Sequence, residues 1–304
     1  MLFPWTGYPR PPIRSPMHSV SKIILTLLVP LYGMGTQFLV LPSSADELSI
    51  GSHSTLPGLF PINPALFIAS ENHPDLSINR GVWLGDVVIA QIGYNQAMEK
   101  KIIHVGLKYS GLSDLEFRDD IPRDNALAEF SSFGLALDAG VSIIRETYKF
   151  GLSLSYIHMG LYTEQSKGMG LNLGYMRTFK RGLRMGLSLQ NLGKMTKLIA
   201  ESPALPTRFT AGISKQLQFN EYKNTVYGSL EWNPVTSTSK YYFGNQFRWN
   251  RLSILAGFSA SDSVIESSLG FSLHLNRYQI SYGIKVGSQN LGLPQIVSLT
   301  LTLP

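Results

Sequence analysis

The 304-residue sequence has no cysteine and few charged residues. Without cysteine the chain can form no disulfide, no thiolate metal site and no cysteine nucleophile. Charged side chains make up 15% of its residues, whereas soluble domains average about 25%. The low charge content therefore argues against an ordinary soluble domain.

The sequence also lacks the short motifs that carry common enzyme chemistry. It contains no G-x-S-x-G elbow, no H-E-x-x-H zinc motif and no phosphate-binding G-x-x-x-x-G-K loop. The Gly168-x-Gly170 spacing lies in a strand pattern and opens no helix, so it does not predict a dinucleotide site. The six histidines are not spaced as metal ligands. We expect no catalytic residue, no metal and no cofactor, with an unrecognised enzyme as a minor alternative.

Basic residues form no run that would suit nucleic acid, although the net charge is +6. The abundant features are instead glycine, which occurs 28 times, and aromatic residues at 11%. Hydrophobic residues reach only 44% and mean hydropathy is near zero, which is too low for a bundle of membrane helices. Few charges, many glycines and moderate hydropathy are typical of a transmembrane β-barrel.

Apolar and polar side chains alternate with period two, most clearly over residues 269–303. In this stretch Phe271 and Leu273 alternate with Ser272 and His274. Such alternation predicts β-strands that have one apolar and one polar face. The period does not decide whether the apolar face touches lipid or a second sheet, so a soluble barrel or sandwich is the alternative.

Residues 75–304 read as a succession of such strands. We expect about fourteen, each of roughly 9–13 residues, which is an even number and a length that suits tilted strands in hydrocarbon. Long loops are expected at 112–127 and 194–206. The last strand would pair with the first, 75–84, so that no sheet edge is left open.

The first 35 residues read as a leader and signal peptide. Residues 1–16 are rich in proline and show no periodicity, and Met17 looks like the true start. Lys22 and the apolar run 23–31 then supply the charged and hydrophobic parts of a secretory signal. The alternative is a membrane anchor over 23–41, but proline and glycine interrupt that stretch.

Residues 36–74 show neither the helical nor the strand period. Five prolines interrupt this segment, at positions 42, 57, 61, 64 and 74. Its apolar residues nevertheless require burial. We interpret the segment as a plug, or hatch, in the barrel lumen, and the alternative is an arm draped over a soluble core.

Several short motifs occur in a fixed order along the chain. They are Phe38-Leu39-x-Leu41-Pro42-x-Ser44-Ala45, Leu48-Ser49-Ile50-Gly51, Asn63-Pro64-Ala65-Leu66, Ala136-Leu137-Asp138-Ala139-Gly140, the glycine-punctuated run from Gly182 to Asn191-Leu192-Gly193, and Leu205-Pro206-Thr207 leading to Gly212. In this order they resemble the PorV/PorQ family of outer-membrane barrels, which is FadL-like and associated with type IX secretion. The resemblance covers most of residues 36–304. We interpret Asn191-Leu192-Gly193 and Leu205-Pro206-Thr207 as turn chemistry at strand ends.

The resemblance implies two candidate sites. The first is the hatch motif, to which we assign a structural role, with contact to a ligand as the alternative. Its residues are Phe38, Leu39, Leu41, Pro42, Ser44, Ala45, Asn63, Pro64 and Ala65. A charged rim loop would contact a partner protein, and the alternatives are that it binds a cation, closes a salt bridge or is simply solvated. Its residues are Glu116, Arg118, Asp119, Asp120 and Arg123.

Two functions follow from this resemblance. The first is an accessory of secretion in the bacterial outer membrane, which would bind type IX components and cargo through its loops. The second is a FadL-like transporter that moves a hydrophobic small molecule past the hatch. The second function needs an apolar pocket, for which the candidates are Phe38, Leu41, Leu59, Phe60, Leu66 and Phe67. In both cases outer-membrane lipid would surround the barrel.

Overall fold

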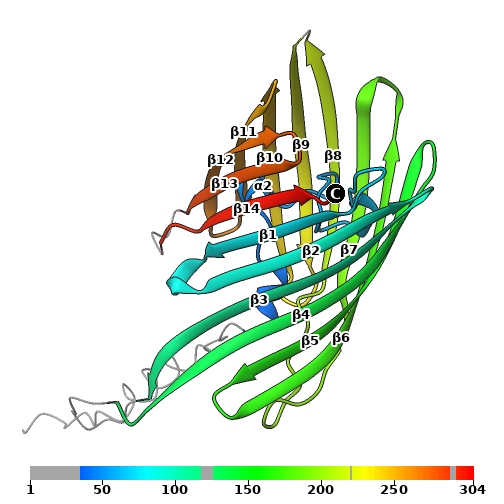
Figure 1. The fold of residues 1–304 in the computed structure, drawn as a ribbon. Helices are drawn as coiled ribbons and strands as arrows, with labels where there is room; N and C mark the ends of the chain where they lie inside the picture. Colours follow the sequence, from blue (N-terminus) through cyan, green and yellow to red (C-terminus); the bar gives the residue numbers. More distant parts are fainter. Residues whose placement is uncertain (1–34, 118–125, 220, 288–291) are drawn as a thin grey trace, which may run out of the picture. The chain divides into compact units, whose positions relative to one another are not determined.

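The strands of this computed structural model close into one antiparallel barrel (Figure 1). The structure describes residues 35–117, 126–219, 221–287 and 292–304, so the expected signal peptide lies outside the described residues. Each strand pairs with its neighbours in sequence, and β14 closes the barrel against β1. The predicted all-β barrel, and the pairing of the last strand with the first, are therefore confirmed.

The described elements follow the chain in a simple order. The strands are β1 (Asp75–Val82), β2 (Val88–Met98), β3 (Lys101–Phe117), β4 (Ala128–Ile144), β5 (Tyr148–Leu161), β6 (Glu164–Thr178), β7 (Leu183–Met195), β8 (Arg208–Phe219), β9 (Tyr222–Asn233), β10 (Thr238–Trp249), β11 (Leu252–Ser261), β12 (Ile265–Leu275), β13 (Tyr278–Gly287) and β14 (Gln295–Thr302). The short helices are η1 (Gly35–Val40), α2 (Ala45–Ile50), η2 (Pro64–Leu66), η3 (Leu84–Asp86) and η4 (Lys180–Gly182).

Strands β3 and β4 are longer than the sequence pattern predicted. Residues 112–117 were expected in a loop, but β3 continues to Phe117 and pairs with the start of β4, where Leu115 faces Phe130. The register shifts between Leu112 and Leu115. Such a bulge disturbs the alternation on which the prediction relied, so the strand was mistaken for a loop.

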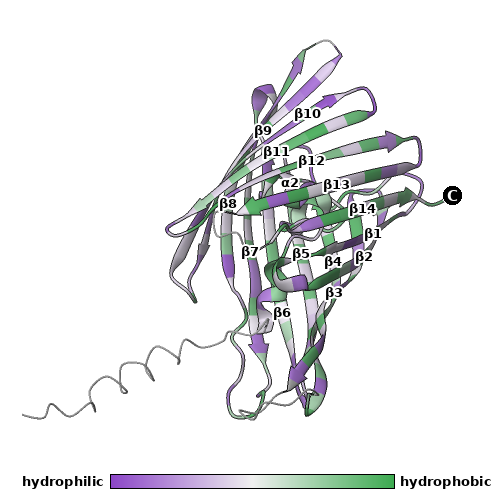
Figure 2. Cartoon of the chain, turned by 90° about the vertical axis from the view of Figure 1, so that its left-hand side faces the viewer, coloured by the Kyte–Doolittle hydropathy of each residue, from purple (hydrophilic) through white to green (hydrophobic). Residues whose placement is uncertain are grey.

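The two faces of the wall have opposite character. Figure 2 shows hydrophobic and hydrophilic residues alternating along the strands. On β12, Leu269 and Phe271 are 60% and 48% exposed on the outside, while Ser268 and Ser272 are only 7% and 0% exposed. The same alternation runs through the other strands. An apolar outer face and a polar inner face are what a barrel in lipid requires.

The two edges of the barrel differ in their connections. At one edge, which we name the turn rim, short turns join β2 to β3, β4 to β5, β6 to β7, β10 to β11 and β12 to β13. At the opposite edge, the loop rim, the connection from β7 to β8 is much longer. Outward aromatic side chains lie near both rims, for example Tyr148 and Trp249 at the turn rim and Trp232 at the loop rim, where tyrosine and tryptophan suit a membrane–water interface.

Most of residues 35–74 lie inside the barrel, and we refer to this segment as the plug (Figure 1); Glu71 to His73, just before β1, are exposed. The sequence analysis expected no regular structure here, and that was wrong for α2. The Ser44 side chain caps its first turn by accepting a hydrogen bond from Glu47 N, and Gly51, at φ 94°, ends it. Capping therefore stabilises one short turn between prolines. Among the described residues, no helix is long and apolar enough to cross a membrane.

Glycines in the wall let the plug backbone approach closely. A Cβ atom at Gly151 would overlap the backbone of Pro64 and Ala65, and one at Gly174 would overlap the Asn63 side chain. Other inward glycines meet the plug in the same way, namely Gly106, Gly134, Gly140, Gly186, Gly244, Gly257, Gly270 and Gly283. The high glycine content of the sequence is thus explained in part by contacts that leave no room for a side chain between wall and plug.

We expect Gly174→Ala to weaken plug docking, because its new methyl group overlaps Asn63. Overpacking of this kind costs about 1–3 kcal/mol. Hydrogen exchange of residues 54–66 measures the loss of protection. Gly170→Ala is the matched control, since a Cβ there has no neighbour nearer than 3.5 Å. Equal protection in the two variants would contradict the steric account.

Candidate functional site

Asn63 of the hatch motif is the central anchor of the plug. Its Oδ1 accepts a hydrogen bond from Ala65 N at 3.0 Å, which caps η2. Its Nδ2 donates to Ser54 O at 2.7 Å within the plug and to Tyr175 O of β6 at 3.1 Å. Pro64 begins η2, where its fixed φ suits the first helical position. The motif therefore holds the plug to the wall.

The first half of the hatch motif forms a second anchor. Phe38 is buried, and Leu39 and Leu41 pack against the same apolar cluster, which contains Met159 and Leu205. The buried Nζ of Lys108 on β3 donates to Leu39 O at 3.3 Å and to Leu41 O at 2.5 Å. A cation that donates to carbonyls at the end of a helix is favourable. Lys108 thereby fixes the end of η1.

The rest of this half lies beside β14 at the start of α2. Pro42 and Ala45 are buried and Ser44 is half-buried. Ala45 N donates to the hydroxyl of Ser298 at 2.8 Å. All the predicted hatch residues thus lie along one interface between plug and wall.

Hydroxyls and amides of the inner wall pair with the plug's backbone. Ser142 donates to Ala65 O at 2.9 Å, Ser188 to Ile62 O at 2.7 Å and Ser268 to Ser49 O at 2.8 Å. Asn95 donates to both Leu59 O at 3.0 Å and Ile68 O at 2.7 Å. Buried backbone carbonyls need such partners. The inward polar residues therefore supply the hydrogen-bond partners that the plug's backbone lacks in the absence of regular secondary structure.

His53 connects α2 to β9, and no sequence motif indicated it. Its Nε2 lies 2.8 Å from Ile50 O and its Nδ1 lies 2.8 Å from Ser229 Oγ. A carbonyl can only accept, so Nε2 carries the hydrogen and Nδ1 accepts from the serine hydroxyl. Burial lowers the pKa of His53 to about 4, against the opposing effect of the Ile50 hydrogen bond. The ring is therefore neutral.

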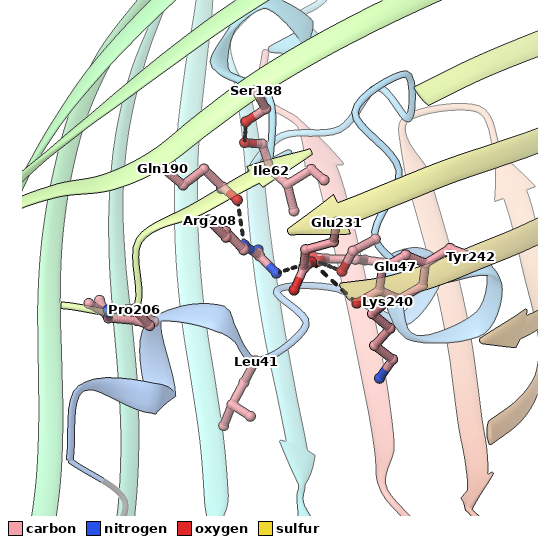
Figure 3. A network of polar contacts seen from close by, with 12 residues as sticks. Leu41, Glu47, Ile62, Ser188, Gln190, Pro206, Arg208, Glu231, Lys240 and Tyr242 are labelled. Atoms are coloured by element: carbon pink, nitrogen blue, oxygen red, sulfur yellow. Dashed lines mark hydrogen bonds and ion pairs between the residues drawn. The ribbon is translucent and has the colours of Figure 1, made fainter. Parts of the chain in front are cut away.

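A buried polar network crosses the inner wall from β7 to β10 (Figure 3). Arg208 donates through Nε to Gln190 at 2.5 Å and through Nη1 to Glu231 at 3.1 Å. The Tyr242 hydroxyl donates to the same Glu231 carboxylate at 3.2 Å. Tyr242 also packs beneath Gly51 of the plug. Removing one partner would leave a buried charge, which typically costs about 3–5 kcal/mol.

Two motifs interpreted as turns instead meet at a bulge. Asn191 lies within β7 at φ 57°, opposite a register shift near Asn172, so that interpretation was wrong for Asn191-Leu192-Gly193. Its Nδ2 donates to Pro206 O at 3.1 Å, and Thr207 donates back to Asn191 O at 3.0 Å. Leu205-Pro206-Thr207 does precede β8. The pair fixes the end of the loop that packs on Phe38.

Two cavities lie between plug and wall, of about 110 and 40 Å³. Both are bordered by the same stretch, Phe60 to Ile62. The larger is lined by apolar plug residues on one side and by wall hydroxyls such as Ser298 on the other. The smaller adjoins Lys108 and Arg208. Each is below the roughly 300–1,000 Å³ of ordinary small-molecule sites, so the described state is closed.

The remaining predicted residues are only partly placed. Leu59, Leu66 and Phe67 are buried, while Phe60 is half-buried against the His104 ring, with 4.8 Å between ring centroids. They surround no single pocket. Of the rim-loop candidates, Glu116 lies in β3, and the other four, Arg118, Asp119, Asp120 and Arg123, lie outside the described residues. Within the described part of the chain, no cluster of side chains could hold a metal ion.

The fold is similar to those of solved outer-membrane channels. One is the monoaromatic hydrocarbon channel CymD, with a TM-score of 0.60 and 13% identity over 86% of this chain and 97% of that chain. Another is the toluene transporter TodX of Pseudomonas putida, with a TM-score of 0.60 and 13% identity over 87% and 99%. No family model and no curated protein matches the sequence. At this identity the similarity shows a shared barrel fold.

We expect the plug to dock less tightly as the pH falls from about 6.5 to about 4. Within this window the ring of a released plug binds a proton, whereas docked His53 stays neutral, so falling pH favours release. The full effect of His53 is about 3 kcal/mol, and above this window its contribution to docking no longer changes with pH.

Hydrogen-exchange protection of residues 49–56, corrected for intrinsic rates, measures this dependence. In His53→Gln, which cannot titrate, protection should no longer change over the same window. An unchanged pH slope in that variant would show that another group is responsible.

Proposed function

We propose that the chain is an outer-membrane barrel that passes small hydrophobic molecules around its plug, as a FadL-like transporter. The observation that carries the proposal is the pair of cavities inside a closed barrel, which share the stretch Phe60 to Ile62 as a common lining. The solved channels of similar fold are named for toluene and monoaromatic hydrocarbons, which supports the same substrate class. The apolar plug side chains of this stretch would contact such a molecule.

Passage requires Phe60 to move. Its ring lies in a notch of the wall where a Cβ at Gly106 would overlap it, and it meets His104 edge-on. The ring is only half-buried, so it is less firmly packed than Phe38 or Phe67. Rotation of this ring would join the two cavities without displacing Asn63.

A second candidate is a type IX accessory protein that binds secretion components and cargo. The ordered PorV/PorQ motifs support it, and so does the closed lumen, since a plug tied to many strands suits a scaffold. Recognition would then take place at the loop rim, where Glu116 lies.

Deletion of the gene should reduce toluene uptake by whole cells, and the wild-type gene should restore it. Phe60→Ala should raise uptake severalfold above wild type because it removes a ring that lines both cavities. Phe258→Ala is the control, since that side chain is outward and 42% exposed. Unchanged uptake on deletion, together with co-purification of secretion components or cargo, would overturn the transporter in favour of the second candidate.

A further inference from the structure

The outer face of β4 to β8 carries an apolar hollow of about 490 Å³. Side chains that point away from the lumen line it, including Phe150, Leu152, Leu173, Tyr175, Leu187 and Phe209. The Phe150 and Tyr175 rings lie 5.0 Å apart. Gly151 and Gly174, which meet the plug on the inside, also line the hollow. The hollow therefore lies on the outer face, directly behind wall positions that contact the plug on the inside.

Basic side chains lie just beyond the hollow towards the turn rim. Arg177 follows Leu173 and Tyr175 on the outward face of β6, about 7 Å further along the strand than Tyr175. Lys180 and Arg181 lie in the turn between β6 and β7, and Lys215 lies on β8, paired with Leu183. All four cations are exposed.

Within the described parts of the chain, these cations have no acidic partner. The Arg177 guanidinium lies over the Phe179 ring, 5.2 Å from its centroid. Among the residues that the structure describes, no carboxylate forms an ion pair with Arg177, Lys180, Arg181 or Lys215. Acidic side chains at this edge lie in other turns, such as Glu146 between β4 and β5, where Arg145 precedes it. An apolar hollow thus ends at a group of cations that no described carboxylate pairs with.

We propose that this surface binds one anionic glycerophospholipid, with an acyl chain in the hollow and the phosphate at Arg177. Arginine matches phosphate oxygens bidentately, and lysines nearby add charge. The hollow is within the size range of small-molecule sites, roughly 300–1,000 Å³. Short turns mark the periplasmic side of outer-membrane barrels, and the leaflet on that side consists of phospholipid. The inference uses the proposed membrane location, but it does not depend on the proposed transport.

Native mass spectrometry of the detergent-purified full chain tests the proposal, with added phosphatidylglycerol, phosphatidylcholine or lipopolysaccharide. One phosphatidylglycerol should stay bound to the wild type. The triple variant Arg177→Gln, Lys180→Gln, Arg181→Gln should weaken retention about fivefold for each cation removed. Leu173→Trp, which fills the hollow, should weaken it for all lipids alike.

Two control variants should both retain the lipid. One is Lys194→Gln with Lys197→Gln near the loop rim, and the other is Leu230→Trp, whose side chain points outward from β9. Heat-dependent migration on gels confirms that each barrel is closed, and if Leu173→Trp does not fold, the charge variants decide. Equal retention of phosphatidylcholine, tighter retention of lipopolysaccharide, or retention that the triple variant leaves unchanged would overturn the proposal. Toluene uptake is a separate measurement, so failure of the transport proposal is distinguishable.

Discussion

The backbone of the plug is buried in a closed barrel and has little regular structure. The rest of the architecture depends on supplying hydrogen-bond partners to the N–H and C=O groups of this backbone. An unpaired buried carbonyl costs about 1–3 kcal/mol, so a segment of this length could not stay inside without partners. The wall supplies them through residues such as Ser142, Ser188 and Asn95. Inward glycines, such as Gly174, bring the two backbones close enough for these contacts. Polar and small inner residues therefore form one binding surface for the plug.

The fold was largely predictable from the sequence because alternation on a two-sided wall is a local signal. Positions such as Leu269 and Ser268 differ in burial simply because neighbouring side chains point to opposite faces. The signal failed at Leu112 to Leu115, where a bulge breaks the period. It also missed α2, whose single turn is too short to show a helical period and depends on the Ser44 cap.

The site was predictable only where a motif carried it. The hatch motif indicated Asn63 and Phe38, but His53 and Lys108 gave no sequence signal. Arg208 directly follows Leu205-Pro206-Thr207, yet nothing in that motif predicted its buried ion pair with Glu231. Their contacts join residues far apart in the chain, for example His53 with Ser229 and Lys108 with Leu41. Such pairings depend on strand register and on the path of the plug, and neither can be deduced from spacing. The charged rim loop is the reverse case. Its composition stands out in the sequence, but its role stays a prediction.

A closed lumen and a transport function are compatible if part of the plug moves while its anchors hold. The most direct test is to link Asp46 of α2 to Ser272 of β12, whose side chains are 2.8 Å apart. The chain has no cysteine of its own, so Asp46→Cys with Ser272→Cys would introduce a single pair of thiols. Oxidation or a short thiol crosslinker would join them. If only the Phe60 stretch moves, the crosslinked protein, with α2 fixed to the wall, should take up toluene at the same rate as the reduced form. Uptake that stops on crosslinking and returns on reduction would contradict this account, because it would show that the whole plug must leave the wall.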